Sequence, residues 1–214
     1  KLWRAFVAPT PEPAGTAAVA RALRESNYEI KAALRALFLS EAFWAPENRA
    51  TLVKSPVDLV VGSLRSLRVG IGDPLPFVFA LRQLGQDLFA PPNVKGWPGG
   101  EAWIDSSTLL ARKAFLERLM RDQERAQQHA AGTGETGFER ATLRAGDRRL
   151  GMAGRARLLT AWEALRFDAH AWRAELARLK LAPQDVLLPG AARAGAGGGE
   201  RIRLLLLDPL YQLK

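Results

Sequence analysis

Large apolar side chains recur along this chain at the spacing of an α-helix. Between residues 15 and 44 they stand three, four or seven positions apart, and the same spacing returns after residues 56, 76, 108, 157 and 201. Such a period places the apolar residues on one face of a helix that packs against a core. No stretch alternates apolar and polar residues over the length of a strand. The sequence therefore predicts an all-α fold, an irregular bundle of several helices.

Polar residues indicate where three of these helices begin. In Ser55-Pro56-Val57-Asp58 the serine can cap the helix, the proline is tolerated in the first turn, and the aspartate suits the positive end of the helix dipole. Asp105 followed by Ser106-Ser107-Thr108 predicts the start of a long helix, and Asn27 is the expected N-cap of an earlier one.

A run rich in proline, glycine and tryptophan separates two expected helices at residues 89–104. Gly and Pro select particular turns, and tryptophan is costly to leave in water unless it packs or binds something, so an ordered loop is expected. Two interpretations stay open. In the structural one, the two tryptophans fill gaps between helices. In the functional one, the loop binds a glycan or a peptide through Asn93, Lys95, Trp97 and Trp103, beside Arg112 in the helix that follows.

The chain divides by composition into three regions. Residues 1–130 form the expected helical core region, which includes the loop. Residues 131–153 are poor in large apolar groups and are expected to be a flexible connection. Residues 154–214 carry the C-terminal helices, with a linker rich in Ala and Gly at 190–199. After Met120 the long helix becomes polar on every side, which indicates that its end projects into solvent.

The net charge of +9 invites comparison with nucleic-acid-binding proteins. The excess of Lys and Arg is spread along the whole sequence, so nucleic-acid binding is the less favoured interpretation. No apolar run approaches the roughly 20 residues of a membrane-spanning helix, and no transmembrane segment is expected.

The chain offers few residues for catalysis or metal binding. It has no cysteine and only two histidines, His129 and His170, which stand apart in the sequence. No His-Glu-x-x-His pair or carboxylate cluster has the spacing of metal ligands. The hydroxyls of Ser106, Ser107 and Thr108 have no identifiable base to activate them. We therefore predict no catalytic residue, no metal site and no cofactor within the chain.

Several motifs carry a resemblance to a known family. A Leu-Gly-Gln run at 84–86 leads into Pro-Pro-Asn-Val-Lys-Gly-Trp-Pro-Gly-Gly at 91–100, and further motifs stand at 1–7, 40–44, 53–62, 103–104, 109–112 and 208–213. In this order they resemble the C-terminal part of a bacterial family known as domain of unknown function 1800, DUF1800. Asp208 and Leu210 depart from the family's usual Ser-Pro-Glu-Phe/Tyr-Gln ending, and no motif of the family is recognised between 121 and 200.

The resemblance implies a mostly helical bacterial protein without an assigned activity. Members of the family are often exported, which favours an exported or periplasmic location, and they occur together with a second exported uncharacterised family that could supply a protein partner. Lys1 opens within an apolar helical pattern, so the chain is expected to be a fragment of a longer protein.

Three functions remain open on the sequence alone. The leading hypothesis is a noncatalytic helical scaffold or partner-binding region of a larger protein. One alternative is part of an enzyme, such as a hydrolase, whose catalytic residues precede Lys1; the other is glycan or peptide binding through residues 89–104. Burial of Trp97 and Trp103 favours a structural loop, whereas their exposure beside Lys95 and Arg112 favours a binding loop.

Overall fold

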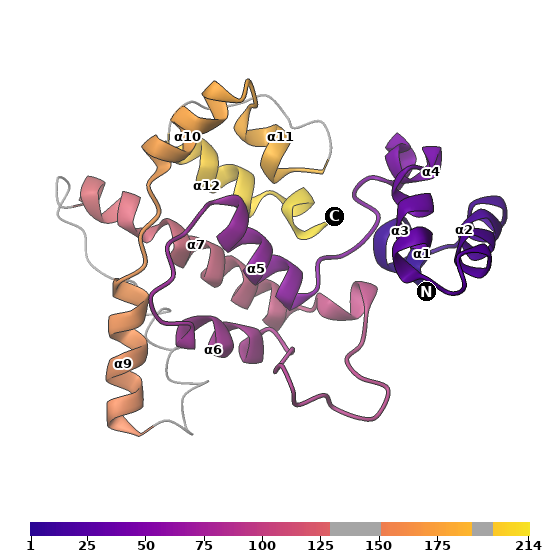
Figure 1. Ribbon diagram of the computed structural model, residues 1–214. Helices are drawn as coiled ribbons and strands as arrows, with labels where there is room; N and C mark the ends of the chain where they lie inside the picture. Colours follow the sequence, from indigo (N-terminus) through magenta and orange to yellow (C-terminus); the bar gives the residue numbers. More distant parts are fainter. Residues whose placement is uncertain (129–150, 190–198) are drawn as a thin grey trace.

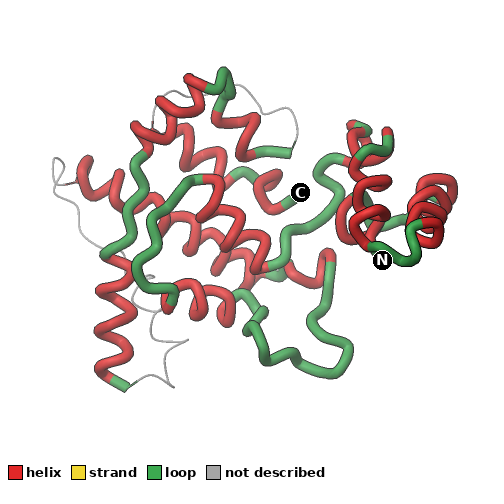
Figure 2. The backbone as a smooth tube through the Cα atoms, viewed as in Figure 1, coloured by secondary structure: helices red, strands yellow, loops and turns green. Residues whose placement is uncertain are grey.

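A computed structural model describes residues 1–128, 151–189 and 199–214 (Figure 1). Throughout this part of the chain the regular structure is helical, and the only β-type pairings are the isolated bridges Val53–Leu213 and Gly70–Arg166. Figure 2 shows the helices joined by long irregular segments. The all-α class predicted from the apolar spacing is confirmed.

The first helices form a small unit with a core of its own. This unit consists of α1 (Leu2–Phe6), α2 (Pro13–Glu25), α3 (Ile30–Phe38), α4 (Glu41–Trp44) and a 3-10 turn (Pro46–Asn48). Its buried cluster is made of Trp3, Val7, Ala8 and Leu37. In Figure 1 these helices gather on one side, joined to the rest by the segment that precedes α5.

The remaining helices share a larger core. They are α5 (Pro56–Ser66), α6 (Leu75–Gln83), α7 (Ser106–Gln128), α9 (Met152–Glu163), α10 (Ala169–Arg178), α11 (Pro183–Leu187) and α12 (Gly199–Leu207), with 3-10 turns at Gly100–Trp103 and Pro209–Gln212. Helix α7 packs against α6 and α12, and α6 also contacts α5 and α9. Buried side chains from α5, α6, α7, α10, α11, α12 and the C-terminal turn belong to one cluster, and the partly buried Trp162 of α9 packs against it.

Two of the three predicted helix starts are confirmed. Ser55 caps α5 by accepting a hydrogen bond from the Asp58 backbone N–H, while the Asp58 carboxylate accepts one from the Ser55 N–H. Asp105 and Thr108 make the same reciprocal pair at the start of α7. The prediction for Asn27 is wrong: Asn27 has a left-handed backbone with φ of 54°, and α3 begins only at Ile30.

The predicted connection and linker fall mainly beyond the described residues. Of the connection at 131–153, only 151–153 are described, and α9 already begins at Met152. Of the linker at 190–199, only Gly199 is described, as the first residue of α12. His129 lies outside the described residues, and His170 is exposed in α10. The predicted regions 1–130 and 154–214 remain predictions, and the two buried clusters follow a different division.

Gly15 provides a test of how α1 and α2 pack. A Cβ atom at position 15 would lie 2.6 Å from Cη2 of the buried Trp3 indole, whereas a Cβ at Gly62 in α5 would meet no atom within 4 Å. We expect Gly15→Ala to destabilise the N-terminal unit by about 1 to 3 kcal/mol through overpacking. Gly62→Ala should stabilise α5 by about 0.5 to 1 kcal/mol, because alanine loses less backbone entropy in a helix.

Hydrogen exchange followed by mass spectrometry distinguishes the two effects by region. Gly15→Ala should accelerate exchange in peptides from residues 1–50, and Gly62→Ala should slow it in peptides from α5. Slower exchange in residues 1–50 of the Gly15→Ala variant would contradict the tight contact with Trp3.

Candidate functional site

The side chain of Arg112 is completely buried although it carries a charge. It projects from α7 and donates two hydrogen bonds: Nη1 to Oε1 of Gln212 at 3.1 Å, and Nη2 to the backbone carbonyl of Lys54 at 2.9 Å. Burial lowers the pKa of Arg112, and the negative charge of Asp58 opposes this change. Arg112 therefore joins α7 to the start of α5 and to the C-terminal segment.

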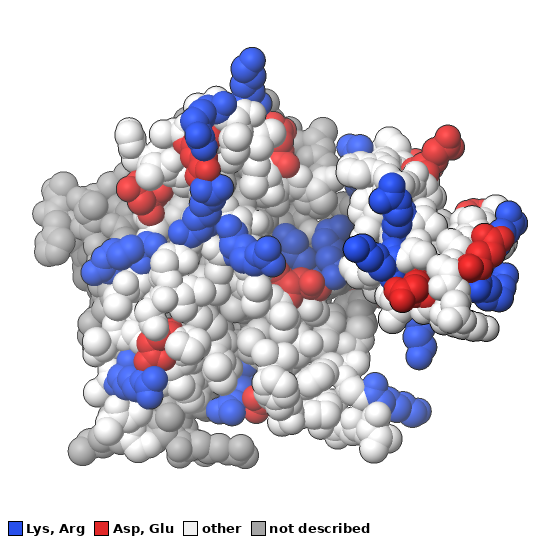
Figure 3. All heavy atoms as spheres, in the orientation of Figure 1, with Lys and Arg blue, Asp and Glu red and all other residues white. Residues whose placement is uncertain are grey.

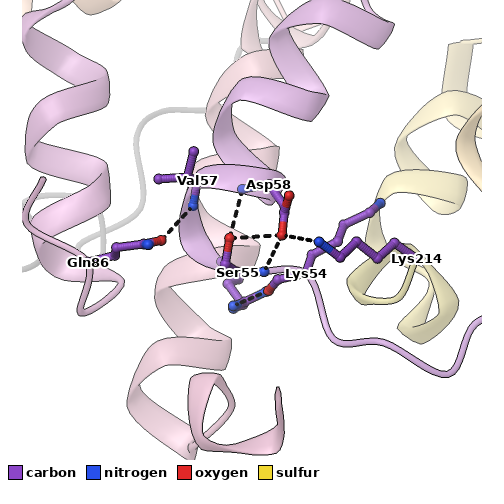
Figure 4. A network of polar contacts seen from close by, with 7 residues as sticks. Lys54, Ser55, Val57, Asp58, Gln86 and Lys214 are labelled. Atoms are coloured by element: carbon purple, nitrogen blue, oxygen red, sulfur yellow. Dashed lines mark hydrogen bonds and ion pairs between the residues drawn. The ribbon is translucent and has the colours of Figure 1, made fainter. Parts of the chain in front are cut away.

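Asp58 supplies the negative charge beside this arginine. Its carboxylate accepts hydrogen bonds from the backbone and hydroxyl of Ser55 and from Nζ of Lys214, the last at 2.6 Å (Figure 4). Burial on its own would raise the pKa of Asp58, but the hydrogen bonds from Lys214 and Ser55 outweigh it, and the pKa is lowered. Asp58 thus stays ionised and holds the C-terminal segment against α5.

The side chain of Lys54 contacts Tyr211 in the C-terminal segment. Its Nζ donates to the Tyr211 carbonyl at 2.7 Å and lies 3.8 Å from the centre of the Tyr211 ring. Burial, reinforced by the charges of Arg112 and Lys214 and opposed by Asp58, lowers the pKa of Lys54 to about 8.

The hydroxyl group of Tyr211 is fixed by a second interaction. Its hydroxyl shares a hydrogen bond of 2.8 Å with the buried hydroxyl of Ser63 in α5, and burial raises the pKa of Tyr211 to about 12. The phenol therefore remains neutral at any pH near 7.

Backbone pairing completes the connection. Lys54 donates its N–H to the carbonyl of Gln212 at 2.8 Å, and Leu52 and Lys214 exchange hydrogen bonds of 3.2 and 2.7 Å. We call the group formed by Lys54, Asp58, Arg112, Tyr211, Gln212 and Lys214 the Arg112 junction.

The segments on both sides of the loop at residues 89–104 are anchored at or beside the Arg112 junction. Just before it, Oε1 of Gln86 accepts a hydrogen bond of 3.0 Å from the Val57 N–H at the start of α5 (Figure 4). Just after it, Arg112 bonds to the Lys54 carbonyl. Both sides of the loop are thus tied to the four residues from Lys54 to Val57.

The residues predicted to bind a ligand on this loop are not brought together as one surface. Trp103 is buried with 6% of its surface exposed, Trp97 is half-buried, and Lys95 and Asn93 are exposed. The Asn93 side chain accepts a hydrogen bond from the Lys95 backbone and so shapes the turn. Arg112 points into the junction. The structure therefore shows Trp103 in a packed position, and a binding role for the set remains a prediction.

The loop presents two apolar side chains to solvent, Phe89 at its start and Val94 further along. Phe89 is 98% exposed and Val94 is fully exposed. Phe89 also has a left-handed backbone with φ of 67°, an unusual conformation for a bulky residue. A hydrogen bond from the Ala90 N–H to the Asp87 carbonyl and an ion pair between Asp87 and Arg82 hold the chain on either side of this residue.

The described residues contain no group of three or more His, Asp or Glu side chains that could hold a metal ion. Within the same residues, no helix is both long and apolar enough to cross a membrane. The charges of the junction join three chain segments.

From the sequence we proposed that Arg112 contacts a ligand, and we did not predict that the Arg112 side chain is buried. A signal for that position exists, because 112 falls on the same helical face as Phe115, Leu116 and Leu119, which are buried. Leu109, which lies on the same helical face as Arg112 and Leu116, is nevertheless 47% exposed. An arginine inside an apolar stripe indicates a buried charge with partners elsewhere in the chain.

Replacing Arg112 should be much more costly than replacing its neighbour. Arg112→Met leaves the Lys54 carbonyl and the Gln212 amide oxygen buried without their donor, and we expect a loss of about 3 kcal/mol in the free energy of unfolding. Lys113→Met is the control, because Lys113 is exposed and its pair with Glu117 spans 3.8 Å; it should change stability by less than about 0.5 kcal/mol. Urea denaturation followed by circular dichroism measures both, and equal losses would contradict the junction.

Stability should also depend on pH through Lys54. Its folded pKa of about 8 lies below the unfolded value of about 10.4, so the unfolded state binds more protons between these values and stability rises with pH in this window. For Tyr211 the folded pKa of about 12 exceeds the unfolded value of about 10, so its contribution is lost as pH rises from 10 to 12.

Urea denaturation from pH 7 to 11 should therefore show a rise above pH 8 and a decline above pH 10. Lys54→Met should abolish the rise, because methionine has no proton to release, whereas Lys31→Met at an exposed position should retain it. A rise of equal size in the Lys54→Met variant would show that another group causes it.

Comparison with known protein families confirms the family resemblance. No curated protein and no solved structure matches the chain. The family described as protein of unknown function (DUF1800) matches residues 1–213. Since this match spans nearly the whole sequence, the chain belongs to the DUF1800 family.

Proposed function

We propose that this chain is a noncatalytic helical module that binds a protein partner through the loop at residues 89–104. The observation that carries the proposal is the exposure of Phe89 and Val94 on a loop whose base is fixed. Isolated exposed apolar residues are common on proteins, and Phe89 combines its exposure with a left-handed backbone, as Tyr28 does elsewhere in the chain. Such a residue is costly to maintain, and a binding role accounts for the cost.

The anchoring of the loop supports this proposal. Gln86 and Arg112 hold its two sides to α5, and Trp103 is buried near its end. A loop fixed in this way loses less conformational entropy when it binds than a free segment would. The loop can therefore bind a partner without first becoming ordered.

The exposed side chains suit a protein better than a glycan. A glycan is recognised by flat aromatic faces with polar groups around them, and Trp103 is buried while Trp97 is half-buried. The groups that reach solvent include the apolar Phe89 and Val94, and the exposed Lys95 follows Val94 directly in the sequence. This combination fits an apolar pocket on a partner protein with a carboxylate at its edge.

Photo-cross-linking in the protein's own cells tests this proposal. A photoreactive phenylalanine analogue placed at Val94 should give a reproducible adduct with one protein. The same analogue at Val78, which is exposed on α6, should not give that adduct. If both positions label the same proteins, or if Val94 labels none, the loop is not a binding site.

Substitution of the two apolar residues tests the same contact by affinity. Phe89→Ser with Val94→Ser should weaken binding of the captured partner about 700-fold, since the two buried apolar side chains contribute about 2 kcal/mol each. Circular dichroism should show an unchanged helical content, because neither side chain contributes to a core. The exposed Leu159→Ser variant on α9 serves as the control.

A further inference from the structure

A second surface, on α5, carries charge instead of apolar groups. The side of α5 that faces solvent presents Asp58, Val61 and Arg65 at helical spacing, and Arg68 follows directly after the helix. Figure 3 shows Lys and Arg side chains in a row across the face of the molecule on which α5 lies, with few Asp or Glu among them. This face lies outside the loop at residues 89–104 in the sequence, and its side chains are charged where Phe89 and Val94 are apolar.

The cations on this face outnumber the carboxylates that neutralise them. Arg68 and Arg178 share one carboxylate, that of Glu175, and Lys214 pairs with Asp58. Arg65 is exposed and makes no ion pair with any described residue. The side chains of Arg68 and Arg178 are 64% and 76% exposed, so their guanidinium groups keep donors free for a ligand.

We propose that this surface binds an acidic segment of a partner protein. We call the surface formed by Arg65, Arg68, Arg178 and Lys214 the α5 basic face. Arginine presents a planar fork of donors that matches a carboxylate with two parallel hydrogen bonds. The net charge of +9 favours an acidic partner, because it attracts one from a distance and repels a second copy of this chain.

The composition of the face favours an acidic peptide over a nucleic acid or a membrane. Proteins that bind single strands place aromatic rings among their cations for bases to stack on, and α5 contains no aromatic residue. Val61 is 42% exposed between Asp58 and Arg65, which suits one apolar side chain of a peptide and is too small an area to enter a bilayer. Asp58 and Glu175 interrupt the row, which a continuous phosphate backbone would oppose.

Fluorescence anisotropy with a labelled glutamate-rich peptide containing a central leucine tests this inference. The parent chain should bind the peptide, with an affinity that falls as salt is added. Arg65→Glu should weaken binding about 10-fold or more, because it removes an attraction and adds a repulsion. Arg21→Glu, an exposed substitution on α2 with the same change of charge, should weaken it less than about 2-fold.

The remaining outcomes overturn the inference. Equal weakening by Arg65→Glu and Arg21→Glu means that total charge, and not this face, attracts the peptide. Tighter binding of a short DNA duplex or of phosphatidylglycerol vesicles, lost in Arg65→Glu, identifies a different ligand class for the face. Absence of peptide binding by the folded parent chain removes the proposal. The loop is unaltered in these variants, so a failure here leaves the loop proposal standing.

Discussion

One buried guanidinium joins three segments of the larger core. Arg112 has no exposed surface, and a charge in that position is tolerated only when oxygen acceptors and an opposite charge lie close to it. The acceptors belong to Lys54 and Gln212, which are 58 and 100 positions away in the sequence. Asp58 supplies the opposite charge. Three distant segments must therefore be in place together, which makes the C-terminal segment an integral part of this core.

The same constraint sets the position of the loop. A long irregular segment would be mobile if only its neighbouring helices held it, but Gln86 and Arg112 fix both of its sides to the start of α5. The capping pair of Ser55 and Asp58 in turn fixes the start of α5. The loop thus extends into solvent between two anchored positions, Gln86 and Arg112.

The fold class and two helix starts could be predicted because their causes are local. Apolar spacing reports on one helix at a time, and the capping partners of Ser55 and Asp105 lie three positions away. The prediction for Asn27 failed because asparagine suits a left-handed turn as well as an N-cap, and the sequence does not distinguish them. The helical face of Arg112 could indicate its burial, but its partners could not be predicted, because they lie 58 and 100 positions away in the sequence.

The structure separates the motifs that resemble the DUF1800 family into residues that form the Arg112 junction and residues that are exposed on the loop. Lys54, Asp58, Gln86, Arg112 and Gln212 come from four separate motifs, and their hydrogen bonds hold one junction together. Stability is enough to explain why these residue types stand there. The exposed Phe89 and Val94 have no such explanation, because they contribute to neither core. Folding therefore accounts for the base of the loop, whereas the exposed Phe89 and Val94 are the residues on which the proposed partner contact depends.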